Sequence, residues 1–219
     1  MKKYIPILKR SRLFGGVGED EIQAMLTCLG ARKQTYKKGE YVLRQGESLR
    51  EISLLAEGSL HIQKDDYWGN RSILGNIAAG ELFGESFAYP QSEPLLYDVV
   101  ADRDSAVIFF DVMRVITTCS GACRFHAMVV HNLFGAMSDK NRKLVQKLEH
   151  MSKRTTREKL ISYLSEQAKS QGTSEFTVPY NRQQLADFLS VDRSAMSNEL
   201  SKMQSQGLIE YNKNTFKLL

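Results

Sequence analysis

The chain has 219 residues, of which 42% are hydrophobic and 25% charged, and its formal net charge is +5. This composition predicts one large or two small folded domains, and it argues against disorder and against a fibrous protein. The longest apolar run, residues 106–110, is too short for a transmembrane helix or a secretion signal. Three cysteines do not make a disulfide scaffold. We therefore expect a cytoplasmic protein with no membrane partner.

Residues 19–30 are expected to form a short amphipathic helix. Acidic residues occupy its first turn, and Gly30 ends it. Cys28 is expected to be a small residue in or beside the core. The apolar residues that recur at helical spacing on one face are Ile22, Met25, Leu26 and Leu29.

From about residue 35 to residue 111, short runs rich in Val, Ile, Leu and Tyr alternate with glycine-containing turns. Strands at roughly 8–12 residue spacing with glycine turns predict an antiparallel β-roll or barrel. Residues 60–63, followed by the segment 65–70, are typical of a hairpin strand and its loop.

Between residues 123 and 151 the apolar residues follow a heptad pattern. The two seam positions hold Ala127, Phe134, Asn141 and Leu148, and Val130, Met137, Leu144 and Met151. Seven of these eight residues are apolar, which favours a two-stranded coiled coil over a lone helix packed on its own domain. A single Asn at such a position costs stability but fixes register and strand number. We therefore predict a homodimer through Val130, Phe134, Met137, Asn141, Leu144 and Leu148.

The positive charge is concentrated in this part of the chain. Residues 124–157 contain eight Lys/Arg and two acidic residues, a local charge of +6. Such a stretch is compatible with nucleic-acid binding or with a solvated helix face. Residues 152–156 interrupt the apolar pattern and predict a hinge, and a second helix is expected at about 157–170.

The last fifty residues have the pattern of a helix-turn-helix. Asn181 and Gln184 form a capping box for one helix, Asp192 caps a second helix over residues 193–206, and Gly207 ends it. Residues 208–211 and 215–218 predict a small β wing. The inward-facing residues are Leu185, Ala186, Leu189, Met196, Leu200 and Met203.

A winged helix-turn-helix places its second helix in the major groove of double-stranded DNA. The outward face at the start of that helix has polar side chains that can read base edges and are not needed for packing. The predicted DNA-contacting residues are Arg182, Gln183, Arg193, Ser194, Ser197, Asn198 and Lys202.

Two stretches carry a resemblance that covers essentially the whole chain. Residues 182–203, followed by Gly207-Leu-Ile, and the segment Gly80-Glu-Leu-Phe-Gly-Glu-Ser86 resemble the cyclic-AMP receptor/FNR (Crp/Fnr) family of bacterial transcription regulators. The resemblance implies an α+β fold with a β-roll sensor (1–122), a long dimerisation helix (123–151) and a winged helix-turn-helix (152–219). It also implies a dimer on an inverted-repeat site and contact with RNA polymerase.

In cyclic-nucleotide-binding relatives, the Gly-Glu turn holds the ribose 2′-hydroxyl, and a following Arg-Ser/Thr-Ala neutralises the cyclic phosphate. Gly84 and Glu85 match the turn, but residues 95–97 are Leu-Leu-Tyr, and no Arg occurs between Arg71 and Arg103. The Thr-Ser pair of the dimer helix is replaced by Arg142 and Lys143. A buried phosphate without its cation is poorly compensated, so we reject cyclic AMP as the effector.

Other effectors leave different traces in a sequence. An FNR-type iron–sulfur cluster needs four thiolates, and the chain has three cysteines. Cys119 and Cys123 form a C-x₃-C pair that is either a thiol switch, part of a metal site with His126 or His131, or two small junction residues. Haem through His61, His126 or His131 is disfavoured, because solitary histidines are more often surface or hydrogen-bonded residues.

An unidentified small-molecule effector remains, bound between the roll and the dimer helix. The predicted pocket residues are Phe83, Gly84, Glu85, Ser86, Tyr97, Arg142 and Lys143. This set suits a small organic anion or a phenol. The alternatives are a cyclic-nucleotide-responsive regulator with a divergent pocket, a thiol-responsive regulator, and a constitutive DNA binder with an empty roll.

No pattern of an enzyme active site is found in the sequence. There is no Gly-x-Ser-x-Gly, Gly-Lys-Ser/Thr or His-Glu-x-x-His, and Asp65-Asp66 lies in a predicted hairpin loop. We therefore predict no catalytic residue, no metal site and no certain cofactor. A ligand-gated subunit without DNA function would share the roll but would not need the C-terminal helix-turn-helix.

Overall fold

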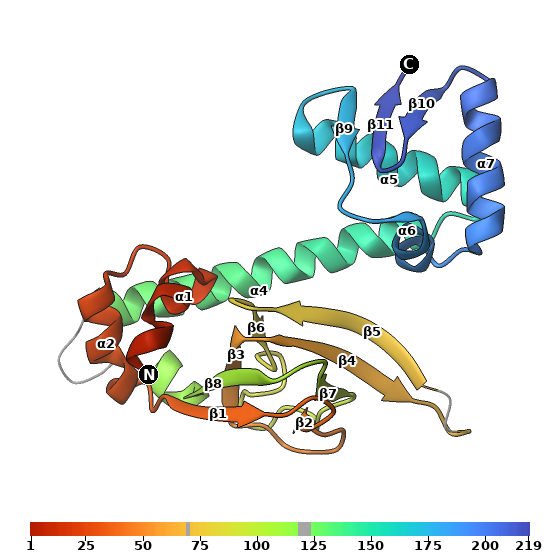
Figure 1. The fold of residues 1–219 in the computed structure, drawn as a ribbon. Coiled ribbons are helices and arrows are strands. Elements are labelled where there is room, and N and C mark those ends of the chain that lie inside the picture. The colour runs from red at the N-terminus through yellow and green to blue at the C-terminus, as the bar shows by residue number, and fades with distance from the viewer. Residues whose placement is uncertain (69–70, 118–123) are drawn as a thin grey trace. The chain divides into compact units, whose positions relative to one another are not determined.

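The computed structural model describes residues 1–68, 71–117 and 124–219. The chain divides into two compact units, Met1–Ser138 and Asp139–Leu219. One long helix, α4 (Arg124–Met151), contributes its first half to one unit and its second half to the other (Figure 1). This division falls inside α4, and the segment boundaries expected from the sequence stay predictions.

The described part of the first unit contains two four-stranded antiparallel sheets, in the strand orders β1-β8-β3-β6 and β2-β7-β4-β5. The strands are β1 (Arg32–Tyr36), β2 (Tyr41–Leu43), β3 (Glu51–Glu57), β4 (Ser59–Asp65), β5 (Arg71–Ala78), β6 (Leu82–Phe83), β7 (Asp98–Ala101) and β8 (Ser105–Asp111). The helices before α4 are η1 (Lys2–Tyr4), α1 (Ile5–Arg10), η2 (Arg12–Phe14), α2 (Glu19–Cys28) and α3 (Val112–Ile116). The predicted β-roll is confirmed.

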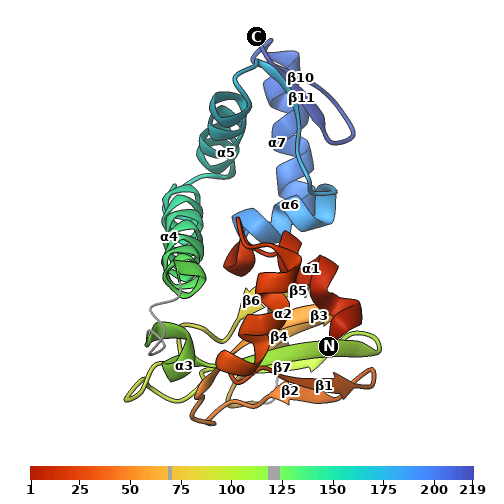
Figure 2. The ribbon, with the colours of Figure 1, turned by 90° about the vertical axis from the view of Figure 1, so that its left-hand side faces the viewer.

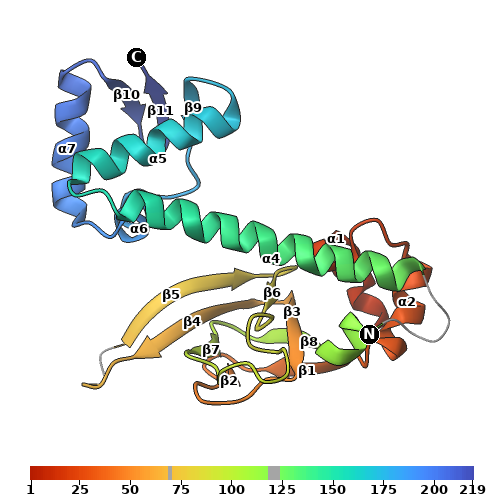
Figure 3. The ribbon, with the colours of Figure 1, turned by 180° about the vertical axis from the view of Figure 1, so that it is seen from behind.

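Strand β8 separates two hydrophobic cores, because successive side chains of a strand point to opposite faces. Val107 and Phe109 face the other sheet and pack in the interior of the roll. Ile108 and Phe110 face the helices, where they pack with α1, α2 and the first half of α4. Figure 3 shows these helices grouped beside the sheet that contains β8. The roll is therefore filled on one face of β8 and covered on the other.

Helix α2 confirms the predicted apolar face, since Ile22, Met25, Leu26 and Leu29 are buried. Cys28, expected in or beside the core, is exposed, so it does not lie in the core. Its place on the helix lies outside the face that the four apolar residues form. The helices and turns before residue 19 were not predicted, although Leu8, Leu13 and Phe14 are fully buried.

The second unit is a winged helix-turn-helix, as predicted. After α4 come α5 (Thr156–Gln171), β9 (Glu175–Thr177), α6 (Arg182–Leu189), α7 (Arg193–Ser205), β10 (Ile209–Asn212) and β11 (Thr215–Leu218). The strands form an antiparallel sheet in the order β10-β11-β9. Figure 2 shows α5, α6 and α7, and Figure 3 shows the sheet beside α5. Strand β9 was not expected from the sequence.

Local caps determine where these helices begin. The Asn181 side chain accepts from the Gln184 N–H while the Gln184 side chain accepts from the Asn181 N–H, which confirms the predicted capping box. A second capping box joins Thr155 and Glu158 at the start of α5, and it was not predicted. Ser190, in the turn between α6 and α7, has φ 51°, a left-handed conformation that ends α6.

Candidate functional site

The recognition helix α7 begins at the predicted cap. The Asp192 carboxylate accepts from the Ala195 N–H at 2.9 Å and from the Ser194 hydroxyl. The Ser194 hydrogen bond, followed by the backbone bond, lowers the pKa of Asp192 from its ordinary value. Asp192 therefore stays ionised at neutral pH and caps the helix. Ser194, predicted to contact a base, here contributes its hydroxyl to this cap.

The remaining predicted residues of α7 lie on its outward face. Met196, Leu200 and Met203 are buried on the opposite face, as expected. Ser197 donates to the Arg193 carbonyl at 2.9 Å, which occupies its hydroxyl within the helix. Among the described residues, no hydrogen bond or ion pair engages the exposed side chains of Arg193, Asn198 and Lys202. These three side chains are available to a groove of DNA.

Arg182 and Gln183, both predicted to contact DNA, make contacts within the domain. The Arg182 guanidinium lies 4.7 Å from the ring centre of Tyr211 and 5.1 Å from that of Phe216, both in the wing. Burial lowers the pKa of Arg182, and the cation is held against aromatic faces. Gln183 donates to Asp187 at 2.8 Å. Their role at DNA stays a prediction.

Helix α5 holds the helix-turn-helix through contacts that the sequence analysis missed. The Lys159 ammonium donates to the carbonyls of Leu189 and Ser190 at 3.1 and 3.2 Å, which satisfies the end of α6. Arg157 forms an ion pair with Glu199 of α7. No local sequence pattern signals these contacts, because each joins residues about thirty or more positions apart.

The predicted dimer residues lie on a face of α4 that this chain leaves uncovered. Val129, Leu133 and Ala136 are buried in the first unit. Val130 is half-buried and Asn141 is exposed. The exposed apolar residues of α4 include Phe134 (72%), Met137 (40%), Leu144 (60%), Val145 (57%) and Leu148 (65%). A strip of this kind is typical of an interface between copies, and the seam stays a prediction.

The predicted effector cassette begins at β6 and turns sharply at Gly84. Gly84 has φ 78°, and a Cβ there would lie 3.2 Å from the Leu49 side chain, so the turn requires glycine. Phe83 and Glu85 are 3% and 8% exposed, whereas Ser86 is exposed. Phe83 therefore packs in the interior core of the roll, Gly84 and Glu85 are buried, and Ser86 is exposed.

Leu95 is the residue that the sequence comparison aligned with the arginine of the nucleotide-binding relatives, and this alignment stays a prediction. It is 1% exposed and packs in the interior core of the roll. Its backbone is fixed by two hydrogen bonds to the loop at 46–47, of 2.8 and 2.9 Å. If the predicted alignment holds, a hydrocarbon side chain fills the position at which a phosphate would need a cation.

Tyr97 lies near the same core. Its ring meets Phe87 edge-on, with ring centres 5.5 Å apart and planes at 89°. Burial, followed by the charge of Glu85, raises the pKa of Tyr97, so its hydroxyl stays protonated at neutral pH. The cassette therefore presents a phenol and apolar surface. Arg142 and Lys143, predicted to join it, belong to the second unit and are exposed, and Arg142 pairs with Asp139.

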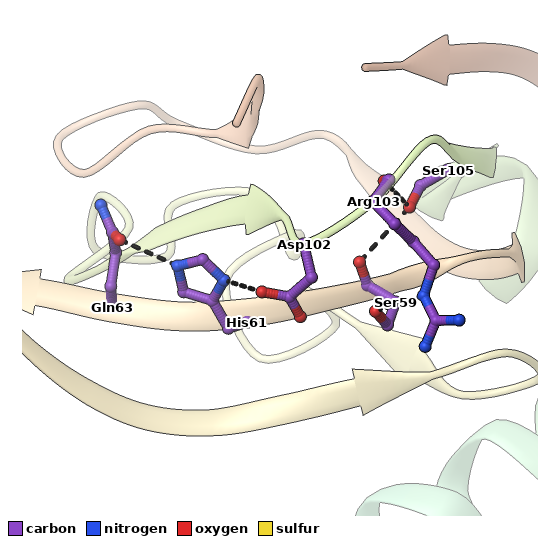
Figure 4. Close-up of polar contacts among 6 residues, drawn as sticks. All are labelled: Ser59, His61, Gln63, Asp102, Arg103 and Ser105. Atoms are coloured by element: carbon purple, nitrogen blue, oxygen red, sulfur yellow. Dashed lines mark hydrogen bonds and ion pairs between the residues drawn. The ribbon is translucent and has the colours of Figure 1, made fainter. Parts of the chain in front are cut away.

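The histidines considered as ligands are engaged in other contacts or exposed. His61 bonds to Asp102 through Nδ1 at 2.5 Å and to Gln63 through Nε2 at 2.9 Å (Figure 4). His126 donates from Nε2 to the Val115 carbonyl at 2.9 Å, and His131 is exposed. Among the described residues, no three His, Cys, Asp or Glu side chains gather as metal ligands. Cys119 and Cys123, the predicted thiol pair, lie outside the described residues.

A search of the described helices finds none that has both the length and the apolar character needed to cross a membrane.

Comparisons with known proteins agree with the two-part organisation. The family model of the cyclic nucleotide-binding domain matches residues 33–120, and that of the Crp-like helix-turn-helix domain matches residues 158–219. The cyclic AMP receptor protein of Thermus thermophilus is 22% identical, and the match covers 92% of this chain and 89% of that protein. Electron transport regulator A of Shewanella oneidensis is 23% identical, with 82% and 71% covered. Cyclic GMP-binding protein C of Dictyostelium discoideum is 28% identical, but the match covers 39% of this chain and 3% of that protein.

Solved structures show the same fold. CprK in complex with OCPA has a TM-score of 0.68 at 16% identity, with 91% of each chain covered. The catabolite activator protein of Thermus thermophilus has a TM-score of 0.51 at 20% identity, with 95% of this chain and 94% of that chain covered.

A roll with a cyclic nucleotide-binding cassette, followed by a long helix and a winged helix-turn-helix, defines a DNA-binding regulator with an effector-binding domain. The chain belongs to the Crp/Fnr family of transcription regulators. The resemblance found in the sequence is thereby confirmed.

Proposed function

We propose that this regulator binds an inverted-repeat DNA site as a homodimer and responds to a small molecule other than cyclic AMP. It works in the cytoplasm, has no catalytic activity and acts on RNA polymerase. The DNA part of the proposal is supported by the Crp-like helix-turn-helix and by the uncommitted side chains of Arg193, Asn198 and Lys202. The dimer is supported by the exposed apolar strip of α4.

The single observation that carries the effector proposal is the buried Leu95. Removing a phosphate from water without a compensating cation is costly, and Leu95 offers only hydrocarbon at that position. The protonated Tyr97 and the aromatic Phe87 instead suit a small phenol, which can hydrogen-bond without a compensating cation. An organic anion would need a cation, and Arg142 and Lys143, the two cations expected from the sequence, belong to the second unit.

A cyclic nucleotide with an altered binding mode is the second candidate. It is favoured by the match of residues 33–120 to the cyclic nucleotide-binding domain and by the retained Gly84 and Glu85. The relatives that match this chain include one named for cyclic AMP and one named for cyclic GMP binding.

Calorimetry and thermal-shift measurements on the full chain distinguish the candidates. Cyclic AMP and cyclic GMP are titrated beside a panel of small phenols and aryl carboxylates. We expect a shift with a member of the panel and none with either nucleotide. Micromolar binding of a cyclic nucleotide, with no binding from the panel, would contradict the effector proposal.

DNA binding is tested by selecting bound duplexes from a random pool. An enriched inverted repeat, with half-sites about one helical turn apart, is the expected result. An unenriched pool, or a single half-site without symmetry, would contradict the proposed dimeric readout.

A further inference from the structure

His150 lies in the last turn of α4 and is 2% exposed. Its Nδ1 is 2.8 Å from the Ser162 hydroxyl oxygen, and its Nε2 is 2.8 Å from a carboxylate oxygen of Glu166. Both partners belong to α5. The side chain therefore bridges the corner at which the chain passes from α4 to the helix-turn-helix domain.

The same imidazole also contacts the first helix of the helix-turn-helix. Its ring meets Tyr163 of α5 at 5.7 Å and 90°, and it lies 6.4 Å from the ring of Phe188 in α6. Phe188 in turn contacts Tyr163 at 5.4 Å and lies under the Lys147 ammonium of α4, 5.3 Å from the ring centre. Three helices therefore meet at one buried side chain.

One of the two hydrogen bonds of His150 has a defined direction. The Glu166 carboxylate accepts only, so the Nε2–H of His150 donates to it. The Ser162 hydroxyl either donates to Nδ1 or accepts from it, because a hydroxyl rotates freely. Leaving a buried N–H without its acceptor costs free energy, so separating α4 from α5 at this point is unfavourable.

The linker between the two helices is too short to separate them. Only residues 152–155 lie between the end of α4 and the start of α5. Ser152 donates to the Glu149 carbonyl at 2.8 Å, and Thr155 caps α5. Hydrogen-bonded helix ends therefore border the segment expected to be a hinge on both sides. The buried side chain of His150 joins α4 to α5 directly.

We propose that His150 is a positioning residue for DNA binding, which fixes the angle between the helix-turn-helix and the last turn of α4. The inference rests on the proposed dimer and inverted repeat. In such a dimer the two recognition helices must lie at a fixed distance to reach both half-sites. A variable angle between α4 and the helix-turn-helix in either subunit would make that distance variable.

The test uses the full chain and the inverted repeat selected from random DNA. Affinities are measured for the intact repeat, for repeats with one base pair added to or removed from the spacer, and for an isolated half-site. His150→Ala should lose on the order of tenfold in affinity for the intact repeat. The affinity differences between repeats of different spacer length should also become smaller. Its half-site affinity should stay at the wild-type value, because α7 is untouched.

His126 offers a matched control in the same helix. It is also 2% exposed, but it bonds to the Val115 carbonyl in the first unit. His126→Ala should keep the wild-type spacer preference. Thermal melting checks that both variants fold.

Two further variants separate packing from hydrogen bonding if His150→Ala does not fold. His150→Phe keeps a ring and loses both hydrogen bonds, whereas His150→Gln keeps an amide donor for Glu166. The proposal is supported if affinity depends more strongly on spacer length in His150→Gln than in His150→Phe. A wild-type spacer preference in His150→Ala or His150→Phe overturns it. A wild-type protein indifferent to the spacer would instead overturn the proposed dimer, and the inference with it.

Discussion

The effector proposal depends on one buried side chain, that of Leu95. Leu95 completes the interior core of the roll, and an arginine there would need a partner of opposite charge. Leu95→Arg should therefore destabilise the full chain by on the order of 3 kcal/mol in thermal unfolding. Millimolar cyclic AMP should recover part of that loss, because its phosphate supplies the missing charge.

Leu96 is the control for this substitution, since it is the next residue and is 56% exposed. Leu96→Arg should change the unfolding free energy by less than about 0.5 kcal/mol. If Leu95→Arg were as stable as the wild type without ligand, the roll interior would not be the closed apolar core described above.

Arg193 is the residue expected to read a base. It starts α7 and is exposed, and among the described residues no hydrogen bond or ion pair engages its guanidinium. Its guanidinium can pair with guanine O6 and N7, a contact worth about 1–3 kcal/mol. Arg193→Ala should weaken the selected site by that amount and relax preference at one base pair, with little change on random DNA. Competition binding at several salt concentrations measures this.

The alternative role for Arg193 is a phosphate contact. It predicts a uniform loss on every DNA sequence and a salt dependence reduced by about one ion. That result would remove Arg193 from the base-reading set. Asn198 is expected to favour adenine at a neighbouring position, which the same selection reveals.

At the scale of the elements, the caps are the features that hold the helix-turn-helix in register. The Asn181 side chain satisfies the Gln184 N–H at 2.9 Å. Asn181→Ala removes this bond and should lower the unfolding free energy by about 1 kcal/mol, measured with urea. Asn181→Asp, which keeps an accepting oxygen, should lose much less. Equal losses in both variants would contradict the capping role.

Local signals in the sequence located some elements accurately. The caps at Asn181 and Asp192 and the apolar positions of α7 depend on residues within a few positions of one another, and the structure confirms them. Gly84 and Glu85 were singled out by resemblance to the family, and their role at an effector stays a prediction.

Features that depend on distant residues were missed. Strand β9 has three residues and forms only by pairing with β11, some forty positions later. The burial of His150 and the support of Ser190 by Lys159 require α5 to be in place. Cys28 lies outside the apolar face of α2, so helical periodicity alone could have predicted that it is exposed.

For the whole molecule, the prediction concerns the state of association. Met137 and Leu144 are 40% and 60% exposed on α4. Replacing both with Lys places charge in the proposed seam, so sedimentation should show monomers. DNA affinity should collapse, because two half-sites no longer act together.

Asn141→Leu is the matched control in the same seam. It should preserve or strengthen association while loosening register or strand number, since a buried Asn costs stability but specifies pairing. A Met137→Lys, Leu144→Lys protein that still sediments as a dimer would show that the interface lies elsewhere.

The exposed apolar strip of α4 has a consequence for the level of the protein in the cell. A single chain exposes Phe134, Leu144 and Leu148 to solvent, and in the proposed homodimer a second copy would cover them. Apolar side chains on a helix between two folded units are what quality-control proteases and chaperones engage. Degradation should therefore fall as synthesis rises past the dissociation constant of the dimer. The regulator would then accumulate above a threshold of expression instead of in proportion to it, and its promoter strength would set whether it is present at all.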